Sequence, residues 1–285
     1  MKRILITGAN SYIGMSFEKH MKQYGGYEID TVDMIDGSWR QYDFSKYDTV
    51  FHVAGIAHSD PKADQRDLYY KVNTELAVET AEYAKKCGVK QFIFMSSIIV
   101  YGSNNTHINI NTTPTPKNFY GDSKLQADIR LHKLSDKAFN VVSVRPPMIY
   151  GKGSKGNYPR LSALAKKTPV FPGIKNERSM LYIENLCEFI KIMIDNNENG
   201  IFYPQNREYV NTAELVKTIA EVSGKKIHIV KLFDPLLKPL SNRITTFNKL
   251  FGDMVYDKRM SDYKDFAYCI VDFKESIKRT EAACQ

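Results

Sequence analysis

The chain has 285 residues, of which 43% are hydrophobic and 25% are charged, and its formal net charge is +8. This composition is typical of a globular protein and excludes a disordered chain. Lysine and arginine are spread along the chain without a long basic block, so we expect no nucleic-acid partner. A modest positive charge instead suits a small anionic ligand.

Membrane, metal and disulfide chemistry are not indicated. No apolar run approaches the ~20 residues that a helix needs to cross a bilayer, so we expect no membrane partner. The first apolar run, Arg3–Thr7, is too short for the core of a signal peptide, which predicts a cytoplasmic protein. The cysteines are scattered and form no C-x-x-C pair, which predicts neither a metal site nor a disulfide framework.

Short apolar runs alternate with helical patterns through the first half of the chain. The predicted strands are Arg3–Thr7, Glu28–Asp33, Thr49–Ala54, Gln91–Ser97 and Asn140–Pro146. The predicted helices between them are Tyr12–Gln23, Gln65–Cys87 and Asn118–Ser135. Nearly continuous apolar strands joined by helices are typical of a parallel sheet that is covered on both faces. We therefore predict a Rossmann-type, doubly wound α/β domain over residues 1–150.

The alternation loosens after Tyr150. A basic glycine-rich loop, Gly151–Gly156, precedes a predicted helix at Tyr158–Lys167, and Thr212 is predicted to cap a later helix. Residues 151–285 are predicted to form mainly a smaller C-terminal lobe of mixed α/β structure, and some of its segments can return to the first sheet.

A glycine turn follows the first predicted strand. The segment Thr7–Gly14 reads TGANSYIG and leads into the first predicted helix. Gly8 allows a tight turn, and Gly14 lets the helix pack closely on the strand, so that backbone N–H groups face a pyrophosphate. Ser11 stands where a middle glycine is expected. The strand–turn–helix context still predicts a dinucleotide-binding turn.

An acidic residue follows at the distance that such a turn requires. Asp33 ends the second predicted strand, nineteen residues after Gly14. A carboxylate there accepts hydrogen bonds from the adenosine ribose and repels a 2′-phosphate, which favours NAD(H) over NADP(H). Asp30 and Asp36 lie close by, and the sequence leaves NADP(H) open. Taken alone, Asp33 is equally typical of a solvated loop.

Tyr120 and Lys124 are four residues apart, which places them on one face of a predicted helix. A free tyrosine, with a pKa near ~10, is a poor base at neutral pH, and a nearby ammonium favours the phenolate. Tyr120 could then exchange a proton with a hydroxyl or keto oxygen while hydride moves at the same carbon. Ser97, at the end of a predicted strand, is a candidate to share that proton, although serine pairs such as Ser96–Ser97 commonly serve only as turns or caps.

Together with further motifs, these pieces resemble one family over nearly the whole chain. The motifs, in order, are TGANSYIG at Thr7–Gly14, YDF at Tyr42–Phe44, HVAG at His52–Gly55, VN at Val72–Asn73, SSIIVYG at Ser96–Gly102, YGDSK at Tyr120–Lys124, RPPMIYG at Arg145–Gly151 and RSMLYIENL at Arg178–Leu186. The chain resembles an extended short-chain dehydrogenase/reductase of the NAD-dependent epimerase/dehydratase group.

The resemblance implies site residues for a cofactor and a substrate. It places Ser97, Tyr120 and Lys124 at the catalytic positions. The implied cofactor-binding residues are Gly8, Asn10, Ser11, Tyr12, Ile13, Gly14, Asp33, Asp43, Phe44, Val53, Ala54, Gly55, Asn73, Tyr120, Lys124, Pro147 and Ile149. The implied substrate-binding residues are His58, Ser97, Met148, Asn157 and Arg178. Arg243 and Arg259 are further candidates, and they and His58 are equally typical of structural or exposed positions.

Within these sets the resemblance implies individual roles. Asp43 and Phe44 would border the adenine, whereas Pro147 and Ile149 would line the nicotinamide end. Arg178 would pair with a phosphate of a nucleotide sugar through its forked donors.

The resemblance implies chemistry at C4 of a UDP-linked hexose. Met148 stands where many epimerases of the group carry an asparagine, so reduction of a UDP-4-keto-6-deoxy-N-acetylhexosamine is placed slightly ahead of 4-epimerisation of UDP-glucose or UDP-N-acetylglucosamine. A 4,6-dehydratase is less well supported, because Ile98 and Ile99 follow Ser97 where an Asp-Glu pair is expected. The RPPMIYG and RSMLYIENL segments resemble a subgroup from surface-polysaccharide pathways.

Two further points stay open. A non-catalytic dinucleotide sensor on the same fold is the rival interpretation, since fold alone does not establish catalysis. The helices Gln65–Cys87 and Asn118–Ser135 could pair across a two-fold axis, as in the family's homodimers, but their apolar positions equally permit burial within one chain.

Overall fold

The structure is a computed structural model that describes the chain except for residues 58–62, 104, 231–251 and 283–285. The chain divides into two compact units. Unit 1 comprises Met1–Asn104, Thr112–Pro147 and Leu186–Pro204, and unit 2 comprises Asn105–Asn111, Met148–Asn185 and Gln205–Gln285. The roles that the sequence assigns to residues 1–150 and 151–285 stay predictions.

Unit 1 contains a six-stranded sheet in which every pair of neighbouring strands is parallel. Its strand order is β10-β6-β4-β3-β1-β2. The strands are β1 (Lys2–Thr7), β2 (Tyr27–Val32), β3 (Thr49–His52), β4 (Gln91–Met95), β6 (Asn140–Val144) and β10 (Gly200–Phe202). The chain order reverses between β1 and β3, which is where ligands bind in open α/β sheets. This confirms the predicted Rossmann-type fold.

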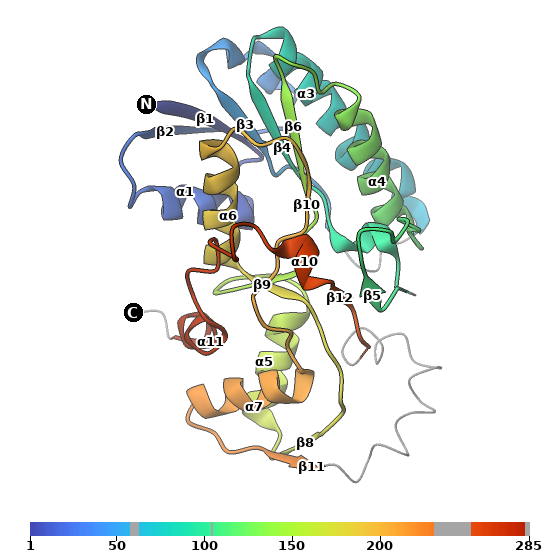
Figure 1. The fold of residues 1–285 in the computed structure, drawn as a ribbon, viewed down its shortest axis with the longest axis vertical. Coiled ribbons are helices and arrows are strands. Elements are labelled where there is room, and N and C mark those ends of the chain that lie inside the picture. The colour runs from blue at the N-terminus through green and yellow to red at the C-terminus, as the bar shows by residue number, and fades with distance from the viewer. Residues whose placement is uncertain (58–62, 104, 231–251, 283–285) are drawn as a thin grey trace. The chain divides into compact units, whose positions relative to one another are not determined.

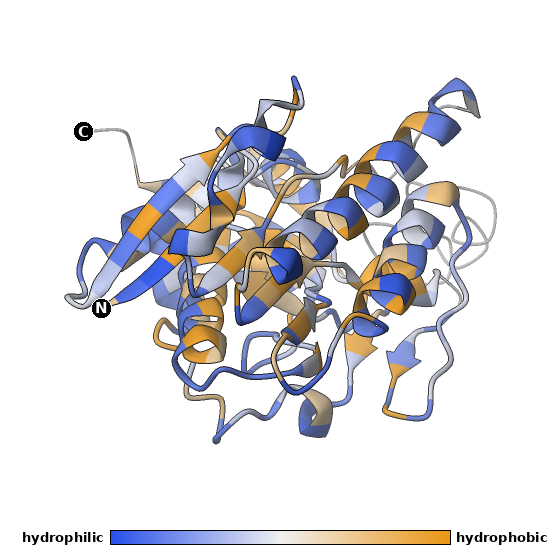
Figure 2. Ribbon diagram, turned by 90° about the horizontal axis from the view of Figure 1, so that it is seen from above, coloured by the Kyte–Doolittle hydropathy of each residue, from blue (hydrophilic) through white to orange (hydrophobic). Residues whose placement is uncertain are grey.

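Helices cover both faces of this sheet. In Figure 1, α1 and α6 lie on one side of the strands, and α3 and α4 lie on the other. These helices are α1 (Tyr12–Met21), α3 (Leu76–Lys86), α4 (Phe119–His132) and α6 (Ile183–Asp195). Because both faces are covered, β3 and β4 are buried throughout, and β1 and β6 are buried except at their first residues. Figure 2 shows the inner strands mostly in the hydrophobic colour, whereas the helices carry hydrophilic bands.

The sequence placed the ends of three inner strands two residues too late. Strands β3, β4 and β6 end at His52, Met95 and Val144, because the ladder pairing stops there. The segments that follow, including Ser96 and Ser97, are therefore loops beyond the carboxyl edge of the sheet.

The predicted helix Gln65–Cys87 is divided in the structure. It consists of α2 (Arg66–Tyr70), a π-helical turn at Lys71–Glu75, and α3. The turn contains Asn73, which is fully buried and makes hydrogen bonds outside the helix. Such π-turns occur most often at functional sites in helices. Short 3₁₀ helices cover Ser38–Gln41, Phe44–Lys46, Ala63–Gln65 and Ile98–Tyr101.

Unit 2 is built from short elements. Its two-stranded parallel pairs are β5 (His107–Ile108) with β12 (Val255–Tyr256), β7 (Met148–Tyr150) with β9 (Met180–Tyr182), and β8 (Val170–Pro172) with β11 (His228–Val230). Its helices are α5 (Asn157–Lys167), α7 (Thr212–Val222), α10 (Lys258–Ser261) and α11 (Phe273–Glu281). In the described part of the chain, no helix combines the length and apolar character needed to cross a membrane.

The predicted cap of α7 was wrong by one residue. Asn211 is the N-cap, and its Oδ1 accepts hydrogen bonds from the backbone N–H groups of Ala213 and Glu214. Thr212 is the first helical residue, and its side chain binds Asn176 instead. The sequence offered two adjacent residues that can cap, and the stronger capping residue took the position.

Candidate active site

The turn between β1 and α1 depends on two glycines. Gly8 has a φ of +119°, and a Cβ there would lie 2.8 Å from the backbone nitrogen of Ala54, so only glycine fits. Ser11 is the N-cap of α1, and its Oγ accepts from the N–H of Gly14 at 3.2 Å. A Cβ at Gly14 would lie 2.6 Å from that oxygen. Ser11, which departs from the glycine pattern, thus stabilises the start of the helix.

The next residues of the turn lead into α1, and the end of β1 is hydrogen-bonded to the loop after β3. Asn10 adopts a left-handed conformation with φ of 61°, which asparagine tolerates better than most residues. Tyr12 and Ile13 form the first turn of α1 and are half-buried. The N–H groups of Val53 and Ala54 both donate to the carbonyl of Thr7. The loops after β1 and β3 therefore form one edge, and Gly55 is exposed beside it.

Of the acidic residues near the end of β2, Asp33 lies directly beyond the strand. It is exposed, and its Oδ1 accepts from the backbone N–H of Ile35 at 2.9 Å. Asp30 lies within β2 and accepts from the Tyr47 hydroxyl at 2.7 Å. Asp36 accepts from Ser38, and these hydrogen bonds hold its pKa below the usual value. Asp33 is therefore exposed just beyond β2, and its predicted contact with the ribose stays a prediction.

Asp43 and Phe44 have different surroundings. Asp43 is exposed, and hydrogen bonds from Ser45 hold the pKa of its carboxyl below the usual value. The Phe44 side chain is fully buried in the core, with its ring 4.9 Å from that of Tyr83 in an edge-on arrangement. Their predicted contacts with adenine stay predictions.

Tyr120 and Ser97 come together at the carboxyl edge of the sheet. Asn118 caps α4 by accepting from the N–H of Gly121 at 2.8 Å, which places Tyr120 in the first turn of the helix. Burial raises the pKa of Tyr120 above its usual value, and the neighbouring Ser97 side chain opposes that rise. The ring of Tyr69 packs edge-on against that of Tyr120, 5.9 Å away.

Lys124 lies one turn further along α4 and is only 5% exposed. Its ammonium donates to the carbonyl of Met95 at 2.8 Å and lies 4.6 Å from the centre of the Phe94 ring. Burial lowers the pKa of Lys124 to about 8, while the charge of Asp128 acts in the opposite direction. A lysine pKa so far below the usual value is uncommon and is typical of functional sites.

Asn73 joins this helix to the loop after β3. Its Oδ1 accepts from the N–H of Ile56 at 2.8 Å, and its Nδ2 donates to the Ile56 carbonyl and to the Ser123 hydroxyl, each at 3.1 Å. Ser123 in turn donates to the carbonyl of Tyr120 at 2.9 Å. Asn73 therefore holds α4 against the loop after β3, and its predicted contact with the cofactor stays a prediction.

Sequence reasoning missed a buried ion pair in this region. Asp128 and Arg145 are 1% and 4% exposed, and Nε of Arg145 donates to Oδ2 of Asp128 at 2.9 Å. Ser96 donates to the same oxygen at 2.8 Å. The spacing of four residues from Lys124 to Asp128 was the available signal, because it places both on one helix face.

The predicted substrate residues fall mainly in unit 2. Asn157 is the first residue of α5, and Met148 begins β7. Arg178 is half-buried; its Nη1 donates to the carbonyl of Gly252 at 2.9 Å, and burial lowers its pKa. These three residues line one narrow cavity of about 10 Å³ with Leu161, Met180, Val210, Thr212 and Leu215.

The two residues predicted at the nicotinamide end lie in different units. Pro147 is buried in unit 1, and Ile149 is half-buried in β7 of unit 2. His58 and Arg243 lie outside the described residues, and Arg259 is exposed in α10.

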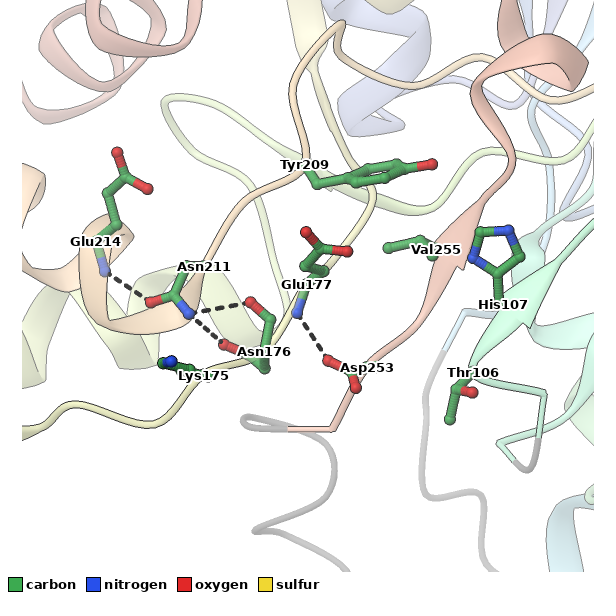
Figure 3. Close-up of a pocket in the computed structure, with 10 residues that line it drawn as sticks. All are labelled: Thr106, His107, Lys175, Asn176, Glu177, Tyr209, Asn211, Glu214, Asp253 and Val255. Atoms are coloured by element: carbon green, nitrogen blue, oxygen red, sulfur yellow. Dashed lines mark hydrogen bonds between the residues drawn. The ribbon is translucent and has the colours of Figure 1, made fainter. Parts of the chain in front are cut away.

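Unit 2 also contains a cavity of about 610 Å³, which the sequence did not predict (Figure 3). It is lined by Thr106, His107, Lys175, Asn176, Glu177, Tyr209, Asn211, Glu214, Asp253 and Val255. Two asparagines form its floor, where Nδ2 of Asn211 donates to the Asn176 carbonyl at 3.0 Å. The N–H of Glu177 donates to Asp253 at 2.7 Å, and Figure 3 shows the Glu177 side chain pointing towards the Tyr209 ring. Within the described ranges, no three potential metal ligands gather, here or elsewhere.

The fold and the edge of its sheet define a class of protein. A glycine turn, an acid after β2 and a Ser–Tyr–Lys group on one parallel sheet are the features of a dinucleotide-dependent dehydrogenase or reductase. A family model for the NAD-dependent epimerase/dehydratase family matches residues 4–204. The chain belongs to this family, which confirms the predicted class of enzyme and its NAD cofactor.

Individual relatives are named as sugar 4-epimerases. The chain is 31% identical over 246 residues to a UDP-glucose 4-epimerase of Vibrio cholerae, covering 77% of this chain and 75% of the relative. It is 28% identical to an N-acetyl-α-D-glucosaminyl-diphospho-ditrans,octacis-undecaprenol 4-epimerase of Escherichia coli O157:H7, covering 82% and 76%. A solved UDP-glucuronic acid 4-epimerase from Bacillus cereus in complex with NAD shares the fold, with a TM-score of 0.71, 16% identity and coverage of 98% and 95%.

Proposed function

We propose that this protein oxidises and reduces the C4 position of a UDP-linked hexose, with Tyr120, Ser97 and Lys124 as its catalytic residues. The observation that carries the proposal is the placement of Tyr120 beside Ser97, whose side chain lowers the pKa of the tyrosine, with a buried lysine one turn away on the same helix. All three groups lie beyond the carboxyl edge of the sheet that carries the Gly8 turn, where this fold binds its ligands.

The residues present fit a nicotinamide dinucleotide. A larger residue at Gly8 would collide with the backbone of Ala54, so the turn stays tight, and the amino end of α1 is the kind of site that binds a pyrophosphate. Asp33 is exposed for hydrogen bonds from a ribose. When bound, NAD supplies the acceptor and donor of hydride. Lys124 would hold the nicotinamide ribose.

The side chains of unit 1 would handle the proton. Tyr120 would take the proton of the C4 hydroxyl when hydride leaves that carbon, and would return it when hydride comes back. Ser97 would keep the reacting oxygen hydrogen-bonded during both steps. The ammonium of Lys124 would stabilise the phenolate of Tyr120, which burial otherwise disfavours.

Unit 2 would select the substrate. Arg178 has a planar group with several N–H donors, one of which already binds the Gly252 carbonyl, and it is suited to a diphosphate. Asn157 lines the same narrow cavity and could donate to a phosphate or sugar oxygen.

For the net reaction, our first candidate is 4-epimerisation. The sequence alone placed reduction ahead, but the relatives from V. cholerae and E. coli match more than three quarters of this chain and are both named 4-epimerases. An epimerase would use Tyr120 and Ser97 twice, and the keto sugar would turn over between the two steps.

Reduction of a UDP-4-keto-6-deoxy-N-acetylhexosamine is the second candidate. The observation that favours it is Met148, which lines the cavity with Asn157 and Arg178 and brings no polar contact. Dimerisation through α3 and α4 and a cytoplasmic location stay predictions.

One experiment separates the candidates. The purified protein is incubated with NAD and UDP-glucose, UDP-N-acetylglucosamine or undecaprenyl-diphospho-N-acetylglucosamine, and the products are resolved by anion-exchange or normal-phase chromatography. A parallel reaction supplies a UDP-4-keto-6-deoxy sugar with NADH or NADPH and follows the absorbance of the reduced nicotinamide. Conversion of a UDP sugar to its C4 epimer without net NADH formation supports the first candidate. Stoichiometric NADH or NADPH consumption supports the second.

Two results contradict parts of the proposal. Turnover of the lipid-linked sugar alone would contradict the proposal that the substrate is UDP-linked. No turnover of any of these substrates, by a protein that binds NAD, would overturn it.

A further inference from the structure

Lys124 is buried, and its charge must be maintained if it is to support Tyr120. Burial in a protein interior can lower the pKa of a lysine by as much as ~3–5 units. Lys124 is 5% exposed, and its ammonium contacts a backbone carbonyl and an aromatic ring, neither of which carries a charge. The fold therefore needs a nearby anion.

The one acid on the same face of α4 is Asp128, one turn after Lys124, among the residues that the structure describes. Its Oδ2 accepts from Ser96 and from Arg145, at 2.8 and 2.9 Å. Its Oδ1 is buried and has no hydrogen-bond partner within the described ranges. The carboxylate thus links the helix that carries Tyr120 to Ser96, which precedes Ser97 in the loop after β4.

The other titratable groups around Lys124 do not replace this charge. On β3, His52 is fully buried between the Phe92 and Phe94 rings, and burial together with the charge of Lys124 lowers its pKa to about 3, so it is neutral. At the end of α4, burial lowers the pKa of His132, which is therefore also mainly neutral near pH 7.

The remaining charged neighbour is Arg145, which follows β6. It is bound to Asp128 and donates from Nη1 to the Tyr101 hydroxyl at 2.9 Å. Asp128 acts on the charge of Lys124 directly, whereas Arg145 is not among the groups that shift it. Within this ion pair, Asp128 is therefore the residue that acts on the charge of Lys124.

We propose that Asp128, held by Arg145 and Ser96, is a positioning residue that keeps Lys124 in its ammonium form and fixes α4 against the loop that carries Ser97. Because Asp128 is only 1% exposed, it would act through Lys124 and not on substrate or cofactor. The inference rests on the proposed role of Lys124, but its electrostatic part can be measured without turnover.

The primary variant is Asp128→Asn, which keeps the size and one acceptor oxygen but removes the charge. The protein is labelled with ¹³Cε-lysine, the Lys124 resonance is identified by its absence in Lys124→Met, and it is titrated by NMR without cofactor. We expect a wild-type midpoint of about 8, well below the ~10.4 of exposed lysines. In Asp128→Asn the midpoint should fall by roughly one unit or more, because the ammonium loses its anion while Arg145 stays.

The same shift should appear in the activity. The alkaline limb of the kcat/KM profile reports loss of the Lys124 proton, so it should move to lower pH by a similar amount in Asp128→Asn. Asp128→Glu keeps the negative charge, so the midpoint of its alkaline limb should lie within a few tenths of a pH unit of the wild-type value. Glu79→Gln removes a charge from an exposed pair with Arg40 and should leave both titrations unchanged.

A folding failure of Asp128→Asn does not end the test. Leaving Arg145 unpaired in the interior is costly, so the double variant Asp128→Asn/Arg145→Met removes both charges at similar volume. It should show a smaller shift in the same direction.

Two results separate the possible failures. A folded Asp128→Asn or double variant with an unshifted Lys124 midpoint overturns the inference and leaves a purely structural ion pair. A shifted midpoint in a protein that turns over no sugar sinks the proposed function and leaves the inference standing.

Discussion

The two units of the chain differ in how they hold their candidate functional groups. In unit 1, Tyr120, Ser97 and Lys124 lie at the edge of a six-stranded sheet and are anchored by backbone bonds and buried polar partners. In unit 2, Arg178 and the cavity of Figure 3 lie among two-stranded pairs and loops, with several charged side chains exposed. A rigid sheet suits chemistry that requires fixed geometry, whereas loops suit a site that varies with the substrate.

This difference leads to a division of labour that can be tested. Changes in unit 1 should alter rate and cofactor binding, and changes in unit 2 should alter substrate affinity.

The largest effect is expected for Tyr120→Phe. Removing the hydroxyl that exchanges the proton should lower kcat by ~10²–10⁴-fold, the usual contribution of a general acid–base group. NAD affinity, measured by calorimetry, should stay within a factor of about three, because the ring remains. Tyr70→Phe is the matched control, since that hydroxyl donates to Asp122 at the helix surface. A Tyr120→Phe protein with wild-type kcat would place the chemistry outside unit 1.

Arg178→Met should have the next largest effect, on substrate binding. The loss of a charged, forked donor should raise KM for the nucleotide sugar by ~10–100-fold and leave NAD affinity unchanged. Arg178→Lys should recover only part of the loss, because an ammonium cannot form two parallel hydrogen bonds. The control is Arg207→Met, which removes an exposed arginine of unit 2 that pairs with Asp265. An unchanged KM in Arg178→Met would mean that unit 2 does not bind the diphosphate through Arg178, which would contradict the role proposed for unit 2.

The sequence predicted the two units unequally, for a physical reason. The turn at Gly8 and Gly14, the Tyr120–Lys124 spacing and the apolar strands are local patterns, and the structure contains all of them. Asp128 was missed although its spacing was visible, because its partner Arg145 is distant in sequence.

The elements of unit 2 depend still more on distant pairing. Strand β8 pairs with β11, and β5 pairs with β12, across about 60 and about 150 residues of chain. Strands of two or three residues have too little periodicity to be recognised, so the cavity that residues of β5 and β12 help to line could not be predicted. The capping error at Thr212 has a smaller cause: two adjacent polar residues were both suitable.

Asp33→Ala sharpens the comparison within unit 1, because it separates cofactor selection from chemistry. The loss of a charged hydrogen-bond acceptor should weaken NAD binding by ~10-fold or more and narrow the preference over NADP. Asp36→Ala is the control, since that carboxylate is engaged by Ser38. Calorimetric titration of both nucleotides provides the measurement. Unchanged affinities in Asp33→Ala would remove this residue from the site.

The smallest effect is expected for Asn211→Ala, which tests whether the loops of unit 2 are independent of the cofactor site. Asn211 caps α7 through Oδ1, and its Nδ2 binds the carbonyls of Ile174 and Asn176 under the cavity. Losing these bonds should reduce the free energy of unfolding by about 1–2 kcal/mol, which lowers the melting temperature by a few degrees. Asn211→Asp keeps the capping oxygen and should lose less. NAD affinity should not change in either variant, because the helix that Asn211 caps belongs to unit 2. A weakening of NAD binding that matches the loss of stability would mean that the two units unfold together. It would contradict the proposal that cofactor binding depends on unit 1 alone.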